Sequence, residues 1–292
     1  MANQGLCHPR GNNESVSSSH GNPIYLGSES YVWDPFCGTG SILIACTSLG
    51  AKTMGSDIDA RVLRGIKRGK QENNVYINFD QYHLRYPDIV RMDIARLPLR
   101  IEEVYDAIVC DPPYGIRAGA RKSGTTDEIK PSTHVPQQGD TIHFPKTQYY
   151  NPDDVIVDLL TLASRSLRLG GRLVYLFPTA GPYPQEAVPC HPCLSLVANS
   201  NEALSGLLNR RLITMEKTQP YCVEKDAEYR AVAYKSLVDY NISYATLKQT
   251  IMQTNAEEGK DKSHRKLRKL ENGKQYTCKD ESSSIDHVVK TN

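Results

Sequence analysis

Short apolar segments recur between residues 31 and 110, and each is followed by a turn or an acidic residue. They fall at residues 31–33, 53–57, 89–93 and 107–110. Runs of this length, bounded by glycine, proline or aspartate, are typical of buried strands, whereas the stretch 42–46 has helical potential. This alternation of strand and helix predicts an α/β fold, in which ligands bind at the carboxyl ends of the strands.

The alternation continues in the middle of the chain. Asn151 is placed to cap a helix with Pro152 in its first position, and apolar residues then recur on one face of that helix. Gly170 is placed to end the helix in the left-handed conformation. We expect the remaining strands at residues 172–177, 211–216 and 229–234. Together these elements predict a mostly parallel, doubly wound sheet.

Composition indicates an ordinary globular domain with polar additions. The 292 residues are 39% hydrophobic and 23% charged. No apolar run approaches the roughly 18 residues of a membrane span, and no signal-peptide core is present. The eight scattered cysteines suit free thiols, so we expect a cytoplasmic or nuclear compartment, and the cytoplasm first. We expect a disordered or partial segment over 1–30, the folded domain over 31–240, and a polar, basic extension over 241–292 that is helical and then disordered.

A turn that contains Gly38 and Gly40 joins the first expected strand to the first expected helix. Glycine lets the backbone approach a ligand closely, and a helix N-terminus offers unpaired N–H groups, so the turn predicts a nucleotide-binding corner. The third glycine of the dinucleotide fingerprint is missing, so a pyrophosphate is not specifically indicated. Asp57 lies about 20 residues further on, where such folds bind ribose hydroxyls. Asp59 is the expected N-cap of a basic helix that reaches Arg68.

The run Asp111-Pro112-Pro113-Tyr114 follows the expected strand at 107–110. A carboxylate and a proline-stiffened carbonyl can accept hydrogen bonds from an exocyclic amine, while an aromatic ring stacks on the face of a flat substrate. The same run could also be a simple turn that closes a buried strand. Asp57, Asp93 and Asp111 all end strand-like segments, and packing alone does not explain three carboxylates beside a glycine turn at one sheet edge.

The order of these motifs resembles that of S-adenosylmethionine-dependent methyltransferases that act on the exocyclic amino groups of nucleobases. More specific blocks resemble the eukaryotic tRNA (guanine-10-N2)-methyltransferase catalytic subunit, a THUMP-containing RNA methyltransferase. These blocks lie at residues 111–117, 170–175, 191–194 and 210–217. The resemblance covers roughly residues 31–217. It implies a Rossmann-like class I methyltransferase domain with an antiparallel last strand.

The resemblance implies transfer of a methyl group from S-adenosylmethionine to N2 of a guanine, at position 10 of tRNA. Asp111 and the Pro112 carbonyl would hold the two N–H groups of the amine, Tyr114 would stack on the base, and Pro113 completes the candidate catalytic set. The candidate cofactor ligands are Asp34, Pro35, Gly38, Gly40, Asp57, Ile58 and Asp93. The reaction requires no metal and no covalent nucleophile.

The resemblance also implies two partners, which are tRNA and a small zinc-binding activator subunit. It implies no association with a membrane. Members of this family carry an N-terminal RNA-binding region ahead of the catalytic domain, whereas this chain begins almost at that domain, after a Ser/Gly/Asn-rich stretch over 11–20. We therefore expect the chain to bind cofactor but to modify tRNA poorly. Its net charge of +2 is too small to indicate nucleic-acid binding.

Two basic groups could contact RNA phosphate. Arg117, Arg121 and Lys122 follow residues 111–114, which we call the amine clamp, and a second basic group lies at residues 260–269. Both could equally be solvated segments without a ligand. Two other functions remain open: an N6-adenine methyltransferase, because the clamp fits any planar amine, and a non-catalytic remnant that binds cofactor or a partner.

Cysteine and histidine residues at 190–193 have a metal-like spacing. A structural zinc site needs four ligands, and no second Cys/His pair stands at a finger-like distance. The Pro189-Cys190 dipeptide is similar to the nucleophilic Pro-Cys of cytosine-C5 methyltransferases, but in those enzymes it occupies the position where this chain has Asp111. We therefore expect Cys190 to be structural.

Overall fold

The structure is a computed structural model that describes residues 7–8, 24–25, 30–67, 70–71, 74–97, 103–114, 119–124, 146–180, 184–205, 208–250 and 252. The polar stretch 11–20, Arg117 and the basic run 260–269 lie outside these residues. The chain divides into two compact units, Met1–Leu247 and Lys248–Asn292, and every element named below belongs to the first. Among the described residues, no helix is both long and apolar enough to cross a bilayer.

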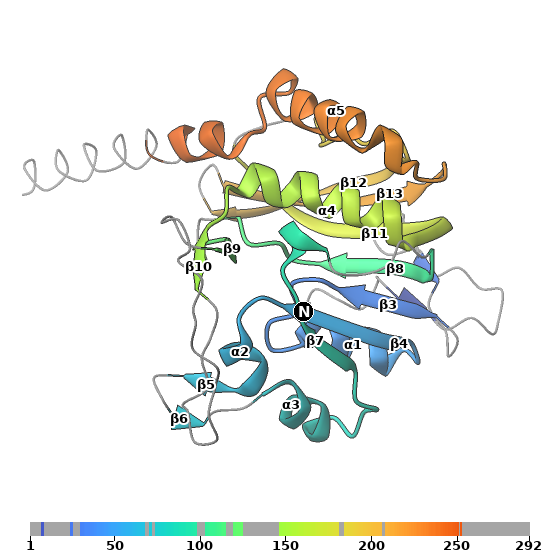
Figure 1. Cartoon of the computed structure of the whole chain (residues 1–292), viewed down its shortest axis with the longest axis vertical. Helices are drawn as coiled ribbons and strands as arrows, with labels where there is room; N and C mark the ends of the chain where they lie inside the picture. The colour runs from blue at the N-terminus through green and yellow to red at the C-terminus, as the bar shows by residue number, and fades with distance from the viewer. Residues whose placement is uncertain are drawn as a thin grey trace, which may run out of the picture. The chain divides into compact units, whose positions relative to one another are not determined.

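A seven-stranded sheet forms the centre of the first unit (Figure 1). In spatial order its strands are β12 (Leu194–Ser205), β13 (Leu208–Lys217), β11 (Leu167–Ala180), β8 (Tyr105–Cys110), β3 (Tyr31–Asp34), β4 (Lys52–Asp57) and β7 (Asp88–Arg91). The pairs from β11 to β7 are parallel, whereas β13 is antiparallel to both of its neighbours. The predicted α/β fold, with a mostly parallel sheet and an antiparallel last strand, is confirmed.

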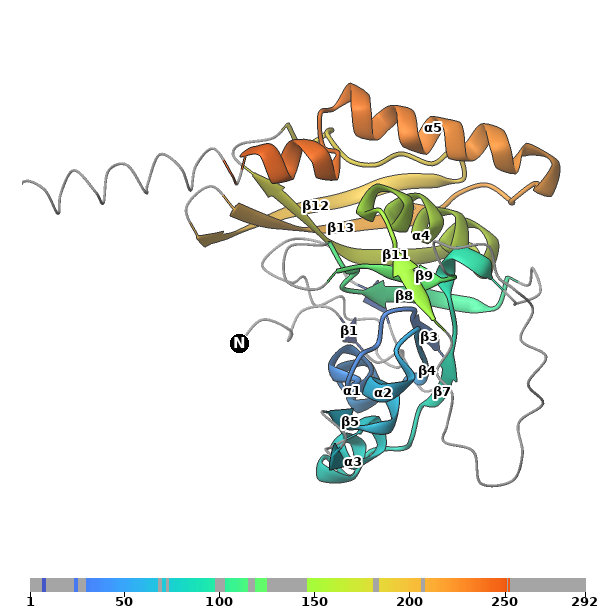
Figure 2. The ribbon, with the colours of Figure 1, turned by 60° about the vertical axis from the view of Figure 1, so that its left-hand side comes forward.

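Helices pack on both faces of this sheet (Figure 2). On one face α4 (Pro152–Ser166) and α5 (Asp226–Asp239) bury the larger core against residues such as Trp33 and Ile213. On the other face α1 (Ser41–Ser48) packs through Cys46 against Val32 and Val109. Further helical elements are α2 (Ala60–Arg64), α3 (Val75–Gln81), η1 (Ile94–Arg96) and η2 (Val223–Lys225).

Three small strand pairs lie outside the central sheet. They are β1 (Cys7–His8) with β2 (Ile24–Tyr25), β5 (Ile66–Lys67) with β6 (Lys70–Gln71), and β9 (Arg121–Ser123) with β10 (Thr147–Tyr149). The last pair falls within the long segment that follows the amine clamp. The Ser123 N–H donates a hydrogen bond to Asp93 Oδ2, which attaches β9 to the residues that follow β7.

The predicted strand at 229–234 is wrong, because this segment belongs to helix α5. The buried apolar residues of α5, which are Tyr229, Ala233 and Leu237, recur every four positions, which is the spacing of one helical face. The partner of β13 is instead β12, which begins at Leu194. A six-residue window of mixed polarity fits both periods, so alternation alone did not distinguish strand from helix.

Two predicted helix ends are also wrong, and a glycine lies near each of them. Helix α4 ends at Ser166, while Gly170, with φ of 76°, lies within β11 where its pairing with β8 is irregular. The left-handed conformation was expected correctly, but it serves a strand irregularity and not the helix end. Helix α2 stops at Arg64 because Gly65, with φ of 66°, caps it, and the next two residues, Ile66–Lys67, form β5.

A lysine at the end of β13 links the end of α4 to the sheet. Lys217 is 0% exposed. Its Nζ donates to the Leu167 carbonyl at 2.8 Å and to Glu103 Oε1 at 2.6 Å. Lys217 therefore satisfies the carbonyl of Leu167, the residue that caps the C-terminus of α4.

Candidate active site

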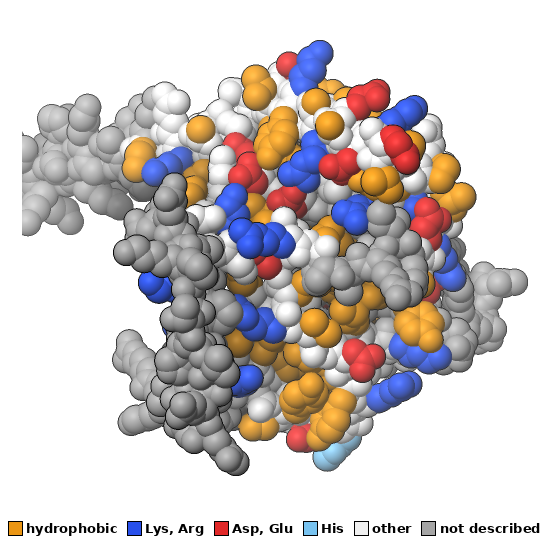
Figure 3. All heavy atoms as spheres, viewed as in Figure 1, with side chains coloured by type: hydrophobic (Ala, Val, Ile, Leu, Met, Phe, Trp, Pro, Cys, Tyr) orange, Lys and Arg blue, Asp and Glu red, His pale blue; other side chains and the backbone are white. Residues whose placement is uncertain are grey.

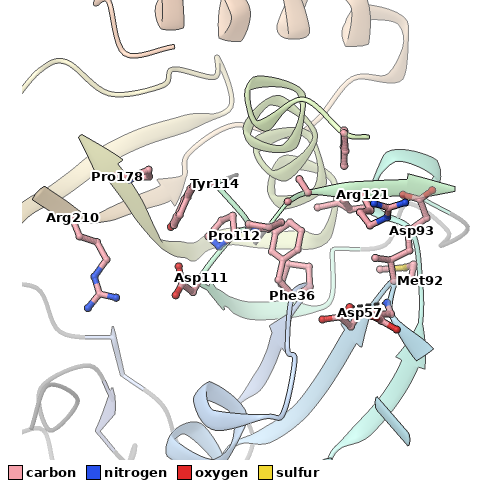
Figure 4. A pocket seen from close by; sticks show the side chains of 18 of the residues that line it. Phe36, Asp57, Met92, Asp93, Asp111, Pro112, Tyr114, Arg121, Pro178 and Arg210 are labelled. Atoms are coloured by element: carbon pink, nitrogen blue, oxygen red, sulfur yellow. Dashed lines mark hydrogen bonds between the residues drawn. The ribbon is translucent and has the colours of Figure 1, made fainter. Parts of the chain in front are cut away.

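The amine-clamp residues lie at the carboxyl end of β8, directly after Cys110 (Figure 4). Asp111 is exposed, Pro112 is buried, and Pro113 and Tyr114 are partly buried. The Tyr114 hydroxyl is buried and lies near Asp111 without forming a well-oriented hydrogen bond. Burial, and then the charge of Asp111, raise the pKa of Tyr114 well above its usual value. Tyr114 is therefore a neutral aromatic wall beside an accessible carboxylate.

These residues line one pocket of about 430 Å³ at the edge where the parallel strands end. The predicted site residues that line it are Pro35, Asp57, Ile58, Asp93, Asp111, Pro112, Pro113, Tyr114 and Arg121. In Figure 4, Asp57, Met92 and Asp93 lie toward one end, and Tyr114, Pro178 and Arg210 toward the other. Asp111 lies beside Tyr114, and Pro112 and Phe36 lie between the two groups, so one pocket joins the acidic end to the clamp end.

Asp57 is held in place by the backbone on both sides of it. Its Oδ2 accepts the Gly38 N–H at 3.1 Å and its Oδ1 accepts the Asp59 N–H at 2.8 Å. Burial raises the pKa of Asp57, and these two N–H groups oppose the rise. Each carboxylate oxygen has a second lone pair, so Asp57 can still accept hydrogen bonds from two hydroxyl groups.

Asp93 joins the acidic end of the pocket to the β9 strand. Its Oδ1 accepts the Ala95 N–H at 3.0 Å, which caps η1, and its Oδ2 accepts the Ser123 N–H at 2.7 Å. The side chain is thus fixed by two backbone donors and still lines the pocket. A hydrogen bond from Asp93 to an adenine amine would use the remaining lone pairs.

Asp34 lies behind the pocket and not on its wall. Its side chain is 1% exposed, and Oδ1 accepts the Phe36 N–H at 2.9 Å. Burial raises the pKa of Asp34 to about 8, the Phe36 N–H opposes the rise, and the charges of Asp57 and Asp111 add to it. At neutral pH the group therefore carries a proton. Its predicted contact with the cofactor stays a prediction.

The two glycines of the turn also lie outside the pocket wall. Gly40 has φ of 87°, and a Cβ atom there would approach Val75 Cγ1 to 2.9 Å. The glycine is therefore required for packing against α3, whatever it binds. Gly38 has φ of 52° with open space where its Cβ would be, and its N–H is already used by Asp57. Close approach of a ligand to Gly38 stays a prediction.

The three basic candidates behave differently. Arg121 lines the pocket near Asp93, where its Nε and Nη2 donate to Thr147 Oγ1 and the Thr147 carbonyl at 2.6 and 2.9 Å. Lys122 points to the other side of β9, 3.7 Å from Asp154 and over the ring of Tyr150. Contacts of either residue with RNA stay predictions, and Arg117 is outside the described residues.

Some of the residues that line the pocket were not predicted from the sequence. The main ones are Phe36, Met92, Tyr150, Pro178, Leu204 and Arg210. Phe36 belongs to the glycine turn and could have been identified from its place in that motif. Arg210 and Pro178 are paired residues on β13 and β11, more than 60 positions from Asp111, so only the strand order brings them to the site.

The metal-like cluster at 190–193 is part of the core. The buried His191 accepts the Cys193 N–H through Nδ1 at 3.1 Å, and burial lowers the pKa of His191 to about 4. Cys190 N–H donates to Ser236 Oγ at 2.9 Å. In the part of the chain that the structure describes, no three His, Cys, Asp or Glu side chains are grouped to hold a metal ion.

The family model and the curated relatives that match this chain are described as methyltransferases. Residues 26–128 match a family model described as the RMKL-like methyltransferase domain, UPF0020. The tRNA (guanine(10)-N(2))-methyltransferase TRMT11 of Homo sapiens is 40% identical over 201 residues, which are 65% of this chain and 43% of that protein. The tRNA (guanine(10)-N(2))-methyltransferase of Schizosaccharomyces pombe is 41% identical over 189 residues, 64% of this chain and 39% of that protein.

Among solved structures, an rRNA methylase from Streptococcus thermophilus aligns with a TM-score of 0.40 and 13% identity, over 66% of this chain and 91% of that one. The chain spans less than half the length of the two tRNA methyltransferases from Homo sapiens and Schizosaccharomyces pombe. The resemblance inferred from the motifs is confirmed: over 65% of its length this chain is a homologue of the TRMT11-type tRNA (guanine-10-N2)-methyltransferases.

Proposed function

We propose that this chain transfers a methyl group from S-adenosylmethionine to N2 of a guanine in tRNA, at position 10. The observation that carries this proposal is the shared pocket, which has the exposed Asp111 and the partly buried Tyr114 toward one end and Asp57 and Asp93 toward the other. The relatives, whose printed names state this reaction, support the choice of guanine and of tRNA.

The acidic end of the pocket fits the nucleoside part of the cofactor. Asp57 and Asp93 are held by backbone N–H groups at the end of β4 and after β7. Ile58, Met92 and Ile94 supply apolar walls on the same side. Carboxylates for ribose hydroxyls and an adenine amine, between apolar surfaces for a flat ring, are what an adenosine needs. When bound, the cofactor supplies a methyl group on a positively charged sulfur.

The clamp residues orient the amine that accepts this methyl group. The exocyclic nitrogen of guanine is a weak nucleophile because its lone pair is delocalised into the ring. Asp111 and the Pro112 carbonyl accept its two N–H groups and favour a tetrahedral nitrogen with an available lone pair. Tyr114 stacks on the base, which must first leave the stack of the RNA helix. Asp111 also stabilises the positive charge that develops on the nitrogen.

The clamp alone does not define the base, so an N6-adenine methyltransferase is the alternative enzyme. Adenine carries the same kind of planar amine, and Asp111 and Pro112 could hold it equally well. A remnant that binds cofactor without turnover is the alternative outside catalysis. The names of the relatives favour guanine, and the accessible clamp favours catalysis.

Three further features belong to the proposal. Residues 31–240 form the methyltransferase domain, between an N-terminal segment over 1–30 and a polar, basic extension over 241–292. A small zinc-binding activator subunit is the protein partner. The compartment is the cytoplasm, and the free thiols of Cys37, Cys46, Cys110 and the other described cysteines suit its reducing conditions.

The test is nucleoside mass spectrometry of unmodified tRNA after incubation with this chain, S-adenosylmethionine and the activator subunit. Methylated guanosine that disappears when the guanine at position 10 is replaced would support the proposal. N6-methyladenosine would favour the adenine alternative. Calorimetric binding of cofactor without any methylated nucleoside would favour the remnant.

Asp57→Asn is expected to weaken cofactor binding by about 1.5–3 kcal/mol, the range for hydrogen bonds to a charged group. The expected increase in Kd in calorimetry is therefore roughly 10- to 150-fold. The matched control is Asp88→Asn, which removes an exposed acid at the start of the neighbouring strand β7, away from the pocket wall. An unchanged Kd for Asp57→Asn would show that the ribose ligand lies elsewhere.

A further inference from the structure

Arg210 stands at the clamp end of the pocket, on strands that extend past the end of β8. Cys110 is level with Tyr175 on β11, and Arg210 is level with Pro178, three residues further along. At about 3.3 Å per residue, Arg210 therefore stands roughly 10 Å beyond the end of β8. Figure 4 places it on the opposite side of Asp111 from Asp57 and Asp93.

A cross-strand glutamate holds one edge of the Arg210 guanidinium. Glu202 on β12 is the register partner of Arg210. Its Oε2 accepts from Nε at 3.0 Å and from Nη2 at 2.8 Å. The side chains are 31% and 51% exposed, so the pair lies at the rim of the pocket and is open to solvent. Such an exposed pair is worth at most about 1 kcal/mol, and its main effect is to orient the guanidinium.

Among the described residues, Arg210 is one of few cations near the clamp. Among the described residues that line the pocket, Arg121 and Arg210 are the basic ones, and Arg121 is engaged with Thr147 near Asp93. Over α4 and α5, acidic and basic side chains are mixed on the face shown in Figure 3. That part of the surface offers no basic stripe along which a nucleic acid could be attracted.

From these observations we propose that Arg210 binds a backbone phosphate of the RNA nucleotide whose base enters the clamp, and that Glu202 orients it for this contact. The inference rests on the proposed function, since it assumes an RNA base at Asp111. When a base enters a pocket, its sugar and phosphate stay at the rim, which is where Arg210 lies. A guanidinium donates two parallel hydrogen bonds to a phosphate, whereas it cannot accept any from the target amine.

The chain offers a matched control on the same strand. Arg172 on β11 pairs with Glu216 on β13 through Nε and Nη2 to Oε2, at 3.2 and 3.1 Å. Glu216 is six residues from Arg210, so both pairs lie on one face of β13, roughly 20 Å apart. Arg172→Ala therefore removes an equivalent ion pair and one charge at a place away from the pocket.

The experiment compares wild type, Arg210→Ala, Glu202→Ala and Arg172→Ala, each with the activator subunit and an unmodified tRNA transcript. The KM for tRNA, kcat and the tRNA Kd are measured at several salt concentrations. One lost phosphate contact reduces the slope of log K against log salt by about 0.7–0.9. Arg210→Ala is expected to show this change, with KM raised about tenfold or more, kcat within a few-fold, and an unchanged cofactor Kd.

The other variants separate the phosphate contact from the ion pair. Glu202→Ala and Arg172→Ala are expected to keep the wild-type slope, because neither removes a cation from the rim. Arg210→Gln, which keeps a long polar side chain but loses the charge, is expected to lose the same slope and serves if Arg210→Ala fails to fold by circular dichroism. Arg210→Lys, which keeps the charge but loses the planar fork, is expected to keep most of the slope. A wild-type slope in Arg210→Ala, or equal effects in Arg172→Ala, would overturn the inference. A low kcat with an unchanged slope would instead indicate contact with the base. If the wild type neither binds nor methylates tRNA, the proposed function itself fails.

Discussion

Methyl transfer is expected to fall by at least about a thousandfold when Asp111 is replaced by alanine, while cofactor affinity stays within a few-fold. Asp111 is an exposed carboxylate at the clamp, separated from the Asp57 and Asp93 end of the pocket. Removing one preorganised group that stabilises developing charge costs roughly 100- to 1,000-fold in kcat, and here the same group also positions the amine. Single-turnover methylation and cofactor calorimetry measure the two quantities.

Asp111→Asn provides the intermediate case, because its carbonyl oxygen still accepts one hydrogen bond but carries no charge. Its rate is expected to lie between those of wild type and Asp111→Ala. If Asp111→Ala lost cofactor binding while its circular dichroism spectrum was that of the wild type, Asp111 would belong to the cofactor end and the proposed role would be wrong.

Asp34→Asn is expected to stabilise the cofactor-free chain, by an amount that grows with pH. Burial raises the pKa of Asp34 from 3.8 to about 8. Between these values the unfolded chain releases the proton and the folded chain keeps it, so the wild type loses up to about 1.4 kcal/mol of stability per pH unit through this group. Asparagine resembles the protonated acid and keeps the oxygen that accepts the Phe36 N–H. Thermal unfolding should show little difference near pH 4 and a gain of roughly 10 °C near pH 8.

Asp59→Asn is the control with the opposite sign. The hydrogen bond from the Arg61 side chain lowers the pKa of Asp59, so its carboxylate adds stability above the unfolded pKa and loses it as pH falls. The pair is exposed, so the effect should be small, and it should disappear at low pH. A gain from Asp34→Asn that did not change with pH would show that the Asp34 proton is not its cause.

Elements with a chemical signal at one end could be predicted from the sequence. Asn151 and Pro152 define the start of α4, and Asn151 Oδ1 does accept the Asp153 N–H at 3.2 Å. Asp59 likewise caps α2. The predictions for the end of α4 and for the segment that forms α5 were wrong, because no residue within these segments determines the structure there. Tertiary packing selected the helix at Tyr229, and a bond to Lys217 satisfies the carbonyl at the end of α4.

The same distinction applies to the site. Asp57, Asp93 and Asp111 follow strands that are adjacent or nearly so, and the rule that strand ends share one edge was enough to bring them together. Arg210 reaches the pocket only because β13 runs antiparallel and extends past β8. The reversed strand places its first residues, and not its last, at the carboxyl edge, which no local pattern in residues 208–217 indicates.

The buried Lys217 also sets a lower limit on the length of chain that can fold. Its ammonium group satisfies the Leu167 carbonyl, 50 positions earlier, and β13 covers the edge of β11. Until residue 217 has left the ribosome, the edge of β11 is uncovered and the Leu167 carbonyl lacks its hydrogen bond from Lys217. A chain in this state is prone to aggregation. Shortening the chain after Leu247 removes none of these contacts. During synthesis the sheet can close only after the last of its strands leaves the ribosome, so folding of this unit is expected to be late and cooperative.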